Sequence, residues 1–348
     1  MEKGISLFVS SCDEQVGYTF CMALLTGPGR QCVDQLYCGA LNPERDLVHE
    51  LEEKGGKILA YHPDQPTEDL LKLLRSIDAI LLIPPHRVYT KDSQRHSSVG
   101  LFEVVHAWQF LVQVTAQAGP RWVTMMSVVG IDQLTELHRV NPARWRRVVL
   151  YQKLETIFRQ AAPHDPAKKR DSFPWCIIRK SLPMDNLFLY QEVIRTDRRL
   201  PLPIAKGNFS PVSMMDVAIG YLTLLRTSMS PLNSILNTSP DKASTTTQVA
   251  HFTGTELVGG RRIAEYGSQV FDVQLTYAPW SPARVRAHLE KFSRLTPEEV
   301  EYLLQVYDMI SENLMDRKSD TLSELLGHPP TTVGQFLQSH ETSFRPRV

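Results

Sequence analysis

The chain opens with the stretch Ile5-Ser6-Leu7-Phe8-Val9, followed by Ser10-Ser11-Cys12-Asp13-Glu14-Gln15-Val16-Gly17. The first five residues form a short apolar run that ends in small and polar residues, which is typical of a buried parallel strand. A helix is predicted to follow over 17–25. A strand, a turn and a helix in this order predict the start of an α/β fold, in which the turn faces the ligand crevice.

Strands and helices continue to alternate beyond this turn. The clearest strand is Ala79-Ile80-Leu81-Leu82-Ile83, which is apolar throughout and is stopped by two prolines that cannot donate to a sheet. Right-handed crossovers between such strands predict a Rossmann-type doubly wound parallel sheet. The other predicted strands are 32–40, 57–61, 122–126 and 175–179, and the helices between them are 43–54, 67–76, 99–118 and 151–160.

The division into domains follows from a change in this pattern. Residues 1–190 are predicted to form the Rossmann-type domain, with a further strand and helix from about 205–275. Within the first range, residues 163–172 are charged, carry two prolines and predict an exposed loop. Only helices are predicted later, over 282–293, 296–314 and 321–326. The predicted fold class is therefore α/β, with a smaller, mainly helical C-terminal lobe over 276–348 on the substrate side.

Composition excludes several classes of protein. The 348 residues are 42% hydrophobic, with 38 acidic and 38 basic side chains, so no net charge favours nucleic acid or a membrane surface. The five cysteines show no CxxC pair, which predicts neither a disulfide framework nor a metal site and is typical of a reducing compartment. No leader and no apolar run that could span a bilayer are recognised, so the expected location is cytoplasmic.

The turn after the first strand departs from the dinucleotide-binding pattern. In this fold glycines let the backbone approach the pyrophosphate, and the helix N-terminus points amides at it. Only Gly17 remains at the third glycine spacing, while Ser11 and Glu14 occupy the first two. If NADP(H) or NAD(H) binds, the residues expected to contact it are Ser10, Ser11, Cys12, Val16, Gly17 and Pro84.

Several segments resemble the NmrA-like branch of the atypical short-chain dehydrogenase/reductases. The opening motif of that family reads roughly T-G-A-T-G-x-x-G at the turn, and Leu41-Asn42-Pro43 looks like its Arg-Asn-Pro after the second strand. The order of these segments covers almost the whole chain, and the resemblance implies a Rossmann-type fold. The later similar segments are Ser76-Ile77-Asp78-Ala79-Ile80, Arg179 to Leu187 with Met184-Asp185-Asn186-Leu187 at its end, Asp216-Val217-Ala218 and residues 325–336.

Two departures from the family bear on the cofactor. A carboxylate at Glu14, where the family has glycine, adds like-charge repulsion and a Cβ where phosphates should approach. Leu41 replaces the arginine that family members use near the adenosine 2′-phosphate, so a preference for NADP(H) does not carry over. In the alternative interpretation, Glu14 faces solvent and a cofactor binds through other groups such as Arg30 or Arg45. The cofactor stays open between these interpretations.

The catalytic pattern is also changed. Classical members of the superfamily use a Tyr-x-x-x-Lys pair, in which the lysine lowers the pKa of the tyrosine. Tyr151 has no lysine four residues later. The NmrA-like pattern has Lys or His at the matching position, followed by a glutamate that Glu155 matches. A phenol at Tyr151 can still donate a hydrogen bond to a ligand carbonyl, or the two side chains can simply pair on one helix face.

Further candidates follow the carboxyl ends of strands, which face the ligand crevice. Ser127 follows the fifth predicted strand, His86 the fourth and Asp185 the sixth, and with Tyr151 they are the predicted catalytic residues. A histidine with a pKa of about 6.5 suits proton transfer. The predicted substrate-binding residues are Met184, Asn186 and Glu155. In the alternative, the histidine is solvated and the loop residues only form a turn.

Three functions stay open. The first is an enzyme that acts on a small hydrophobic molecule by redox-neutral chemistry such as isomerisation or cyclisation, since NmrA-like proteins occur in fungal secondary-metabolite biosynthesis. The second is a non-enzymatic transcriptional co-repressor or redox sensor with a protein partner. The third is an NAD(P)H-dependent oxidoreductase with an unusual phosphate turn. An enzyme needs a deep cavity, whereas a regulator needs an exposed apolar patch.

Overall fold

The computed structural model describes residues 4–63, 68–88, 100–134, 141, 144–162, 175–227 and 247–347. The loop predicted over 163–172 lies outside these residues, as do Thr67 and Val99, the predicted first residues of two helices. Within the described ranges, none of the helices combines the length and the apolar character that crossing a membrane requires.

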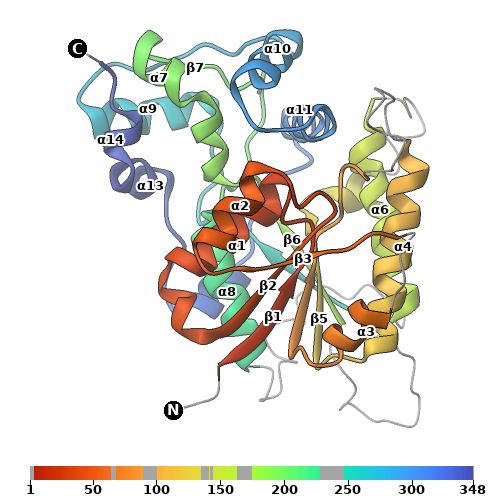
Figure 1. The fold of residues 1–348 in the computed structure, drawn as a ribbon. Helices are drawn as coiled ribbons and strands as arrows, with labels where there is room; N and C mark the ends of the chain where they lie inside the picture. The colour runs from red at the N-terminus through yellow and green to blue at the C-terminus, as the bar shows by residue number, and fades with distance from the viewer. Residues whose placement is uncertain are drawn as a thin grey trace. The chain divides into compact units, whose positions relative to one another are not determined.

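A seven-stranded sheet forms the centre of the fold (Figure 1). Its strand order is β3-β2-β1-β4-β5-β6-β8, and the pairs from β3 through β5 are parallel. The order reverses between β1 and β4, the switch point at which doubly wound sheets bind ligands. The predicted fold class is confirmed. The strands are β1 (Ile5–Val9), β2 (Val33–Ala40), β3 (Lys57–Ala60), β4 (Ala79–Leu82), β5 (Trp122–Val128), β6 (Trp175–Lys180) and β8 (Gln248–Phe252).

Helices cover both faces of this sheet (Figure 1). On one face lie α1 (Gln15–Thr26), α2 (Asp46–Glu53) and α8 (Met214–Thr227), and on the other lie α4 (Leu101–Ala118) and α6 (Arg146–Ala161), with α3 (Glu68–Leu74) packed against α4. The run Ala79–Leu82 is buried throughout between these layers, and so is the second half of the first run, as Phe8 at 0% exposure illustrates. The α6 helix begins at Arg146, earlier than the predicted residue 151.

The chain divides into two compact units that are interleaved along the sequence. The first unit comprises Met1–Ser127, Leu150–Arg179 and Ala218–Ala250, and the second comprises Val128–Val149, Lys180–Val217 and His251–Val348. The lobe predicted over 276–348 therefore lies inside the second unit, which also takes in earlier parts of the chain.

The second unit is mainly helical. Capping boxes start two of its helices: Thr296 pairs with Glu299 at α11, and Thr332 pairs with Gln335 at α13. The prediction of helices alone beyond residue 275 is wrong at one point, because β9 (Thr276–Tyr277) pairs in parallel with β7 (Arg199–Leu200). Its helical elements are η2 (Ile131–Gln133), η3 (Met184–Tyr190), α7 (Gln191–Asp197), α9 (Gly260–Phe271), α10 (Pro282–Phe292), α11 (Pro297–Ser311), α12 (Thr321–Leu326), α13 (Val333–Ser339) and α14 (Glu341–Phe344).

The turn between β1 and α1 keeps the backbone geometry of a glycine-rich turn. Ser11 has a φ of 53°, a left-handed conformation that favours glycine. A Cβ added at Gly17 would lie 2.2 Å from the carbonyl oxygen of Ser11, so only glycine allows the helix to pack this closely on the turn. The turn therefore has the shape of a glycine-rich turn, although Ser11 and Glu14 stand at two of its three glycine positions.

We expect Gly17→Ala to lower the free energy of unfolding by roughly 1–3 kcal/mol, because the added methyl group overlaps the main chain of Ser11. Chemical denaturation measures this change. Gly334→Ala is the matched control, since a Cβ there would lie 3.7 Å from its nearest neighbour, a ring carbon of Tyr266. In α13 the alanine should be neutral or stabilise by up to about 1 kcal/mol. Equal effects of the two substitutions would contradict the close approach at Gly17.

Candidate functional site

Glu14 closes the turn at the switch point. Its side chain is 3% exposed, and both carboxylate oxygens accept the backbone N–H of His86, at 2.7 and 3.0 Å. The N–H of Arg87 donates to Oε1 at 3.1 Å. The interpretation in which Glu14 faces solvent is therefore wrong. The carboxylate ties the first turn to the loop after β4, across the crevice where this fold binds ligands.

Asp13 makes the equivalent connection on the other side of the turn. Its carboxylate accepts the backbone N–H of Leu41 at 3.3 Å and of Asn42 at 3.0 Å, directly after β2. Burial raises the pKa of the Asp13 carboxyl to about 6, although both hydrogen bonds and the nearby Arg45 oppose the rise. Asp13 and Glu14 thus place two buried carboxyl groups at the turn.

The pKa of Asp13 predicts a pH dependence of stability. The folded protein keeps this proton up to about pH 6, whereas the unfolded chain loses it near the ordinary pKa of 3.8. The folded state therefore binds more protons between these values, and the free energy of unfolding should fall by about 3 kcal/mol as the pH rises from about 4 to about 6. Urea denaturation at several pH values measures the slope. Asp13→Asn should remove the contribution of this carboxyl group to the slope of stability against pH. Equal slopes in the variant and the wild type would contradict the raised pKa of Asp13.

The hydroxyl groups of the turn also bind the protein itself. Ser10 and Ser11 donate to the carbonyl oxygen of Ile83 at 3.0 and 2.8 Å, and the N–H of Ile83 donates back to the Ser10 hydroxyl at 2.8 Å. Pro84, the next residue, is buried, and Val16 is half-buried. The predicted cofactor-contacting residues thus lie together at one turn. The hydroxyl groups of Ser10 and Ser11, however, bind the residue that follows β4.

The two arginines considered as alternative phosphate anchors also bind the main chain. Arg45 donates through Nη1 to the carbonyl oxygen of Asp13, and Arg30 donates through Nη1 to the carbonyl oxygen of Val33 at 2.9 Å. Glycine is absent at positions 11 and 14, and two carboxyl groups lie where a pyrophosphate would bring negative charge. The residues of this turn do not fit a dinucleotide bound in the usual way.

Two of the predicted catalytic residues, Tyr151 and His86, lie next to each other. The phenol oxygen of Tyr151 lies 3.5 Å from Nε2 of His86, and the ring centroids are 6.0 Å apart. Tyr151 is 4% exposed and His86 is 6% exposed, so the interpretation of His86 as a solvated loop residue is wrong. Since the backbone N–H of His86 binds Glu14, the same carboxylate that closes the turn also positions this pair.

Ser127, Glu155 and Arg179 form a second buried group. The Ser127 hydroxyl donates to Oε1 of Glu155 at 2.7 Å, and Arg179 donates to both oxygens of the same carboxylate, at 3.0 and 2.8 Å. Tyr151 lies one helical turn before Glu155 on α6, so the two groups share a helix face. Sequence reasoning used Arg179 only as part of a family motif. Its spacing of 24 residues from Glu155 carries no local pattern that would reveal the pair.

The candidates in the second unit have structural contacts. Asp185 accepts the backbone N–H of Met214 at the start of α8, at 3.0 Å, and burial raises the pKa of its carboxyl. Met184 and Asn186 line a small apolar pocket with room for about one water molecule. Sequence reasoning missed Lys180, a buried lysine beside Asp185. Burial lowers the pKa of its ammonium group to about 8.

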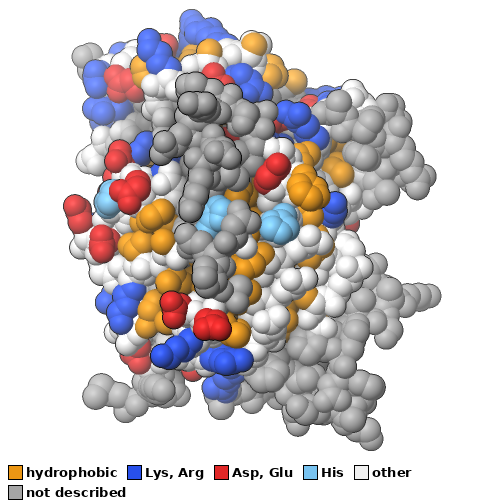
Figure 2. All heavy atoms as spheres, turned by 45° about the vertical axis from the view of Figure 1, so that its right-hand side comes forward, with side chains coloured by type: hydrophobic (Ala, Val, Ile, Leu, Met, Phe, Trp, Pro, Cys, Tyr) orange, Lys and Arg blue, Asp and Glu red, His pale blue; other side chains and the backbone are white. Residues whose placement is uncertain are grey.

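Charged side chains pair within the protein and are mixed in sign. Arg144 binds Asp308, and Arg147 binds Glu301, at 2.5 and 2.8 Å within the second unit. Figure 2 shows basic and acidic side chains interspersed on one face. Arginines of the basic run 144–147 therefore form ion pairs with acidic residues of α11.

No protein family and no curated protein matches the chain in sequence. Solved structures do match it in fold. A nucleoside-diphosphate-sugar epimerase from Staphylococcus aureus has a TM-score of 0.64 at 14% identity and covers 96% of this chain and 100% of its own. An NADPH-dependent quinone oxidoreductase from Escherichia coli has a TM-score of 0.63 at 15% identity, covering 97% and 99%. A Citrobacter sp. triphenylmethane reductase, solved with NADP(H), has a TM-score of 0.63 at 15% identity, covering 96% and 99%. The chain therefore has the Rossmann-type fold of these reductases and epimerases.

Proposed function

We propose that this protein is an NmrA-like enzyme that acts on a small hydrophobic molecule without a bound dinucleotide, by redox-neutral proton transfer of the isomerase or cyclase kind. The observation that carries the proposal is the closed turn, in which Glu14 accepts the N–H groups of His86 and Arg87. The fold resembles reductases and epimerases, yet two carboxyl groups lie where their fold class brings phosphates.

The Tyr151 and His86 pair supplies the proton-transfer groups. A phenol and an imidazole within 3.5 Å of each other can exchange a proton, so one of them protonates a substrate atom while the other accepts a proton. This chemistry moves no hydride and needs no nicotinamide. Burial of both rings keeps bulk water out of the transfer step itself.

The Ser127, Glu155 and Arg179 group supplies a fixed acceptor beside the pair. Because the Ser127 hydroxyl donates to Glu155, its oxygen is left to accept a hydrogen bond from a substrate hydroxyl. Arg179 holds the carboxylate from both oxygens, so the direction of the serine hydrogen bond is set. We assign Ser127 to substrate orientation and Tyr151 and His86 to proton transfer.

The first test is calorimetric titration of the purified protein with NADPH, NADP⁺, NADH and NAD⁺, together with native mass spectrometry of any molecule that copurifies. We expect no dinucleotide to bind with micromolar affinity and an apolar molecule to copurify. Micromolar binding of one dinucleotide would overturn the proposal. It would favour instead an NAD(P)H-dependent reductase or a dinucleotide-sensing regulator.

The second test follows proton transfer directly. Incubation of the copurified molecule with the protein in D₂O should place deuterium on a carbon atom, without a change in oxidation state, as detected by NMR. Tyr151→Phe should slow this exchange by about 100-fold, while Tyr37→Phe, which removes a phenol that binds Gln35, should leave it unchanged. Equal rates in Tyr151→Phe and wild type would exclude Tyr151 from the chemistry.

A further inference from the structure

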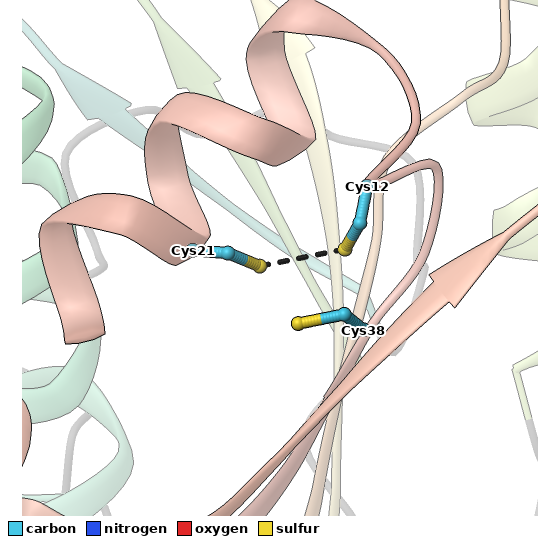
Figure 3. Close-up of side chains that lie close together, drawn as sticks. All are labelled: Cys12, Cys21 and Cys38. Carbon is cyan, nitrogen blue, oxygen red and sulfur yellow. Dashed lines mark hydrogen bonds between the residues drawn. The ribbon is translucent and has the colours of Figure 1, made fainter. Parts of the chain in front are cut away.

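Three cysteines from separate elements converge below the closed turn (Figure 3). Cys12 lies in the turn after β1, Cys21 in α1 and Cys38 in β2, and all three are 0% exposed. Their sulfur atoms lie within 4.8 Å of one another, and those of Cys12 and Cys21 are 3.4 Å apart. In Figure 3 the three thiols point toward a common centre.

We infer that Cys12, Cys21 and Cys38 form a three-coordinate binding site for one thiophilic metal ion, with monovalent copper as the fitting occupant. Thiolate sulfurs are the ligands that select soft ions of this class. Metal–sulfur bonds of about 2.3 Å in a planar three-coordinate site place the sulfurs about 4 Å apart. The sulfurs of Cys12 and Cys21 are 3.4 Å apart and no pair is more than 4.8 Å apart, so the ion fits between the sulfurs with only small side-chain adjustments.

The number of ligands favours copper over the other soft metals. Structural zinc sites take four protein ligands, and iron–sulfur clusters are held by four cysteines. In the described part of the chain the group consists of these three thiols. The remaining cysteines do not join it: Cys32 is half-buried in the short helix before β2 and Cys176 lies on β6.

The backbone around the site is held in place before any ion binds. The N–H of Cys12 donates to the carbonyl oxygen of Gly39 at 2.8 Å, which ties the turn to the residue after Cys38. Within the sheet, Cys38 is the register partner of Val9. Ligands on a rigid scaffold lose little freedom on binding, which raises affinity.

Binding of the metal ion requires the three thiols to become thiolates. Binding of Cu⁺ as three thiolates forms three copper–sulfur bonds and releases to solvent the protons that the thiols carried, with no change in oxidation state. The site is independent of the function proposed above, since neither Tyr151 nor His86 takes part.

The first experiment is an oxygen-free titration of the reduced protein with Cu⁺ held by a chromophoric chelator. We expect one ion per chain, and Cys12→Ser, Cys21→Ser and Cys38→Ser should each weaken binding by more than about 100-fold. Cys32→Ser and Cys176→Ser are the matched controls and should bind as wild type. Loss of binding in either control, preference for zinc in a mixed titration, or no binding by the wild type would overturn the assignment.

The second experiment needs only the wild-type protein, so it stands even where a serine variant does not fold. X-ray absorption of the copper-loaded chain should show three sulfur neighbours at about 2.3 Å, and loading should raise the melting temperature because the ion joins β2, α1 and the turn. Only two sulfur neighbours would overturn the three-coordinate site.

Discussion

Replacement of Arg179 by methionine is expected to lower the free energy of unfolding by about 3–5 kcal/mol. Arg179 donates to both oxygens of Glu155 at 3.0 and 2.8 Å, and both side chains are buried. Without the guanidinium group the carboxylate stays in a low-dielectric environment with the Ser127 hydroxyl and a more distant Arg159, whose Nη2 is 3.6 Å away. The cost is that of an uncompensated buried charge, and urea denaturation measures it.

A double variant separates this cost from a loss of packing. Glu155→Leu combined with Arg179→Met removes both charges, and we expect it to be more stable than Arg179→Met alone. Arg345→Met is the surface control, because Arg345 pairs with Glu341 at exposed positions four residues apart on the chain. It should cost less than about 1 kcal/mol. A double variant less stable than the single one would show that packing, and not charge pairing, governs this position.

Glu14→Gly is expected to have two opposite effects. The substitution removes the acceptor for the N–H groups of His86 and Arg87, which should lower the free energy of unfolding by about 2–4 kcal/mol. It also removes a negative charge and a Cβ from the turn, so the affinity for NADPH should rise by at least about tenfold. Denaturation and calorimetry measure the two effects on the same preparation.

Glu14→Gln separates charge from shape in this prediction. The amide keeps the size of the side chain and one acceptor oxygen, so it should restore part of the stability that glycine loses. If repulsion between charges limits dinucleotide binding, the amide should also raise affinity, whereas a steric limit leaves it unchanged. An unchanged affinity in both variants would contradict the role assigned to Glu14.

Much of the fold could be predicted from local patterns. The apolar run before Pro84 became a buried strand because two prolines end its hydrogen bonding, and the first run became β1 because its side chains are covered on both faces. The two-residue strand β9 could not be predicted, since a pair of residues carries no periodicity. The ends of helices were predicted less well, as the early start of α6 at Arg146 shows.

The candidate site was predicted in part for a similar reason. Residues at the carboxyl ends of parallel strands converge, so placing His86 and Ser127 directly after two predicted strands was enough to bring them to one edge of the sheet. The hydrogen-bond partners of the site residues could not be predicted in this way. Glu14 was recognised as a departure from glycine, but its acceptance of an N–H 72 residues away depends on the exact approach of two loops. From the sequence, Arg179 was recognised only as part of a motif, and its pairing with Glu155 became visible in the structure.

The sequence alone determined the α/β class, the position of the turn and its loss of two glycines, because periodicity and residue type act over a few neighbouring positions. Tertiary structure alone decided which groups meet: the carboxylate of Glu14 with the loop after β4, the phenol of Tyr151 with His86, and three thiols below the turn. Such contacts are set by strand register and by the packing of α1 on the sheet. These distances join residues far apart along the chain, and no local pattern encodes them.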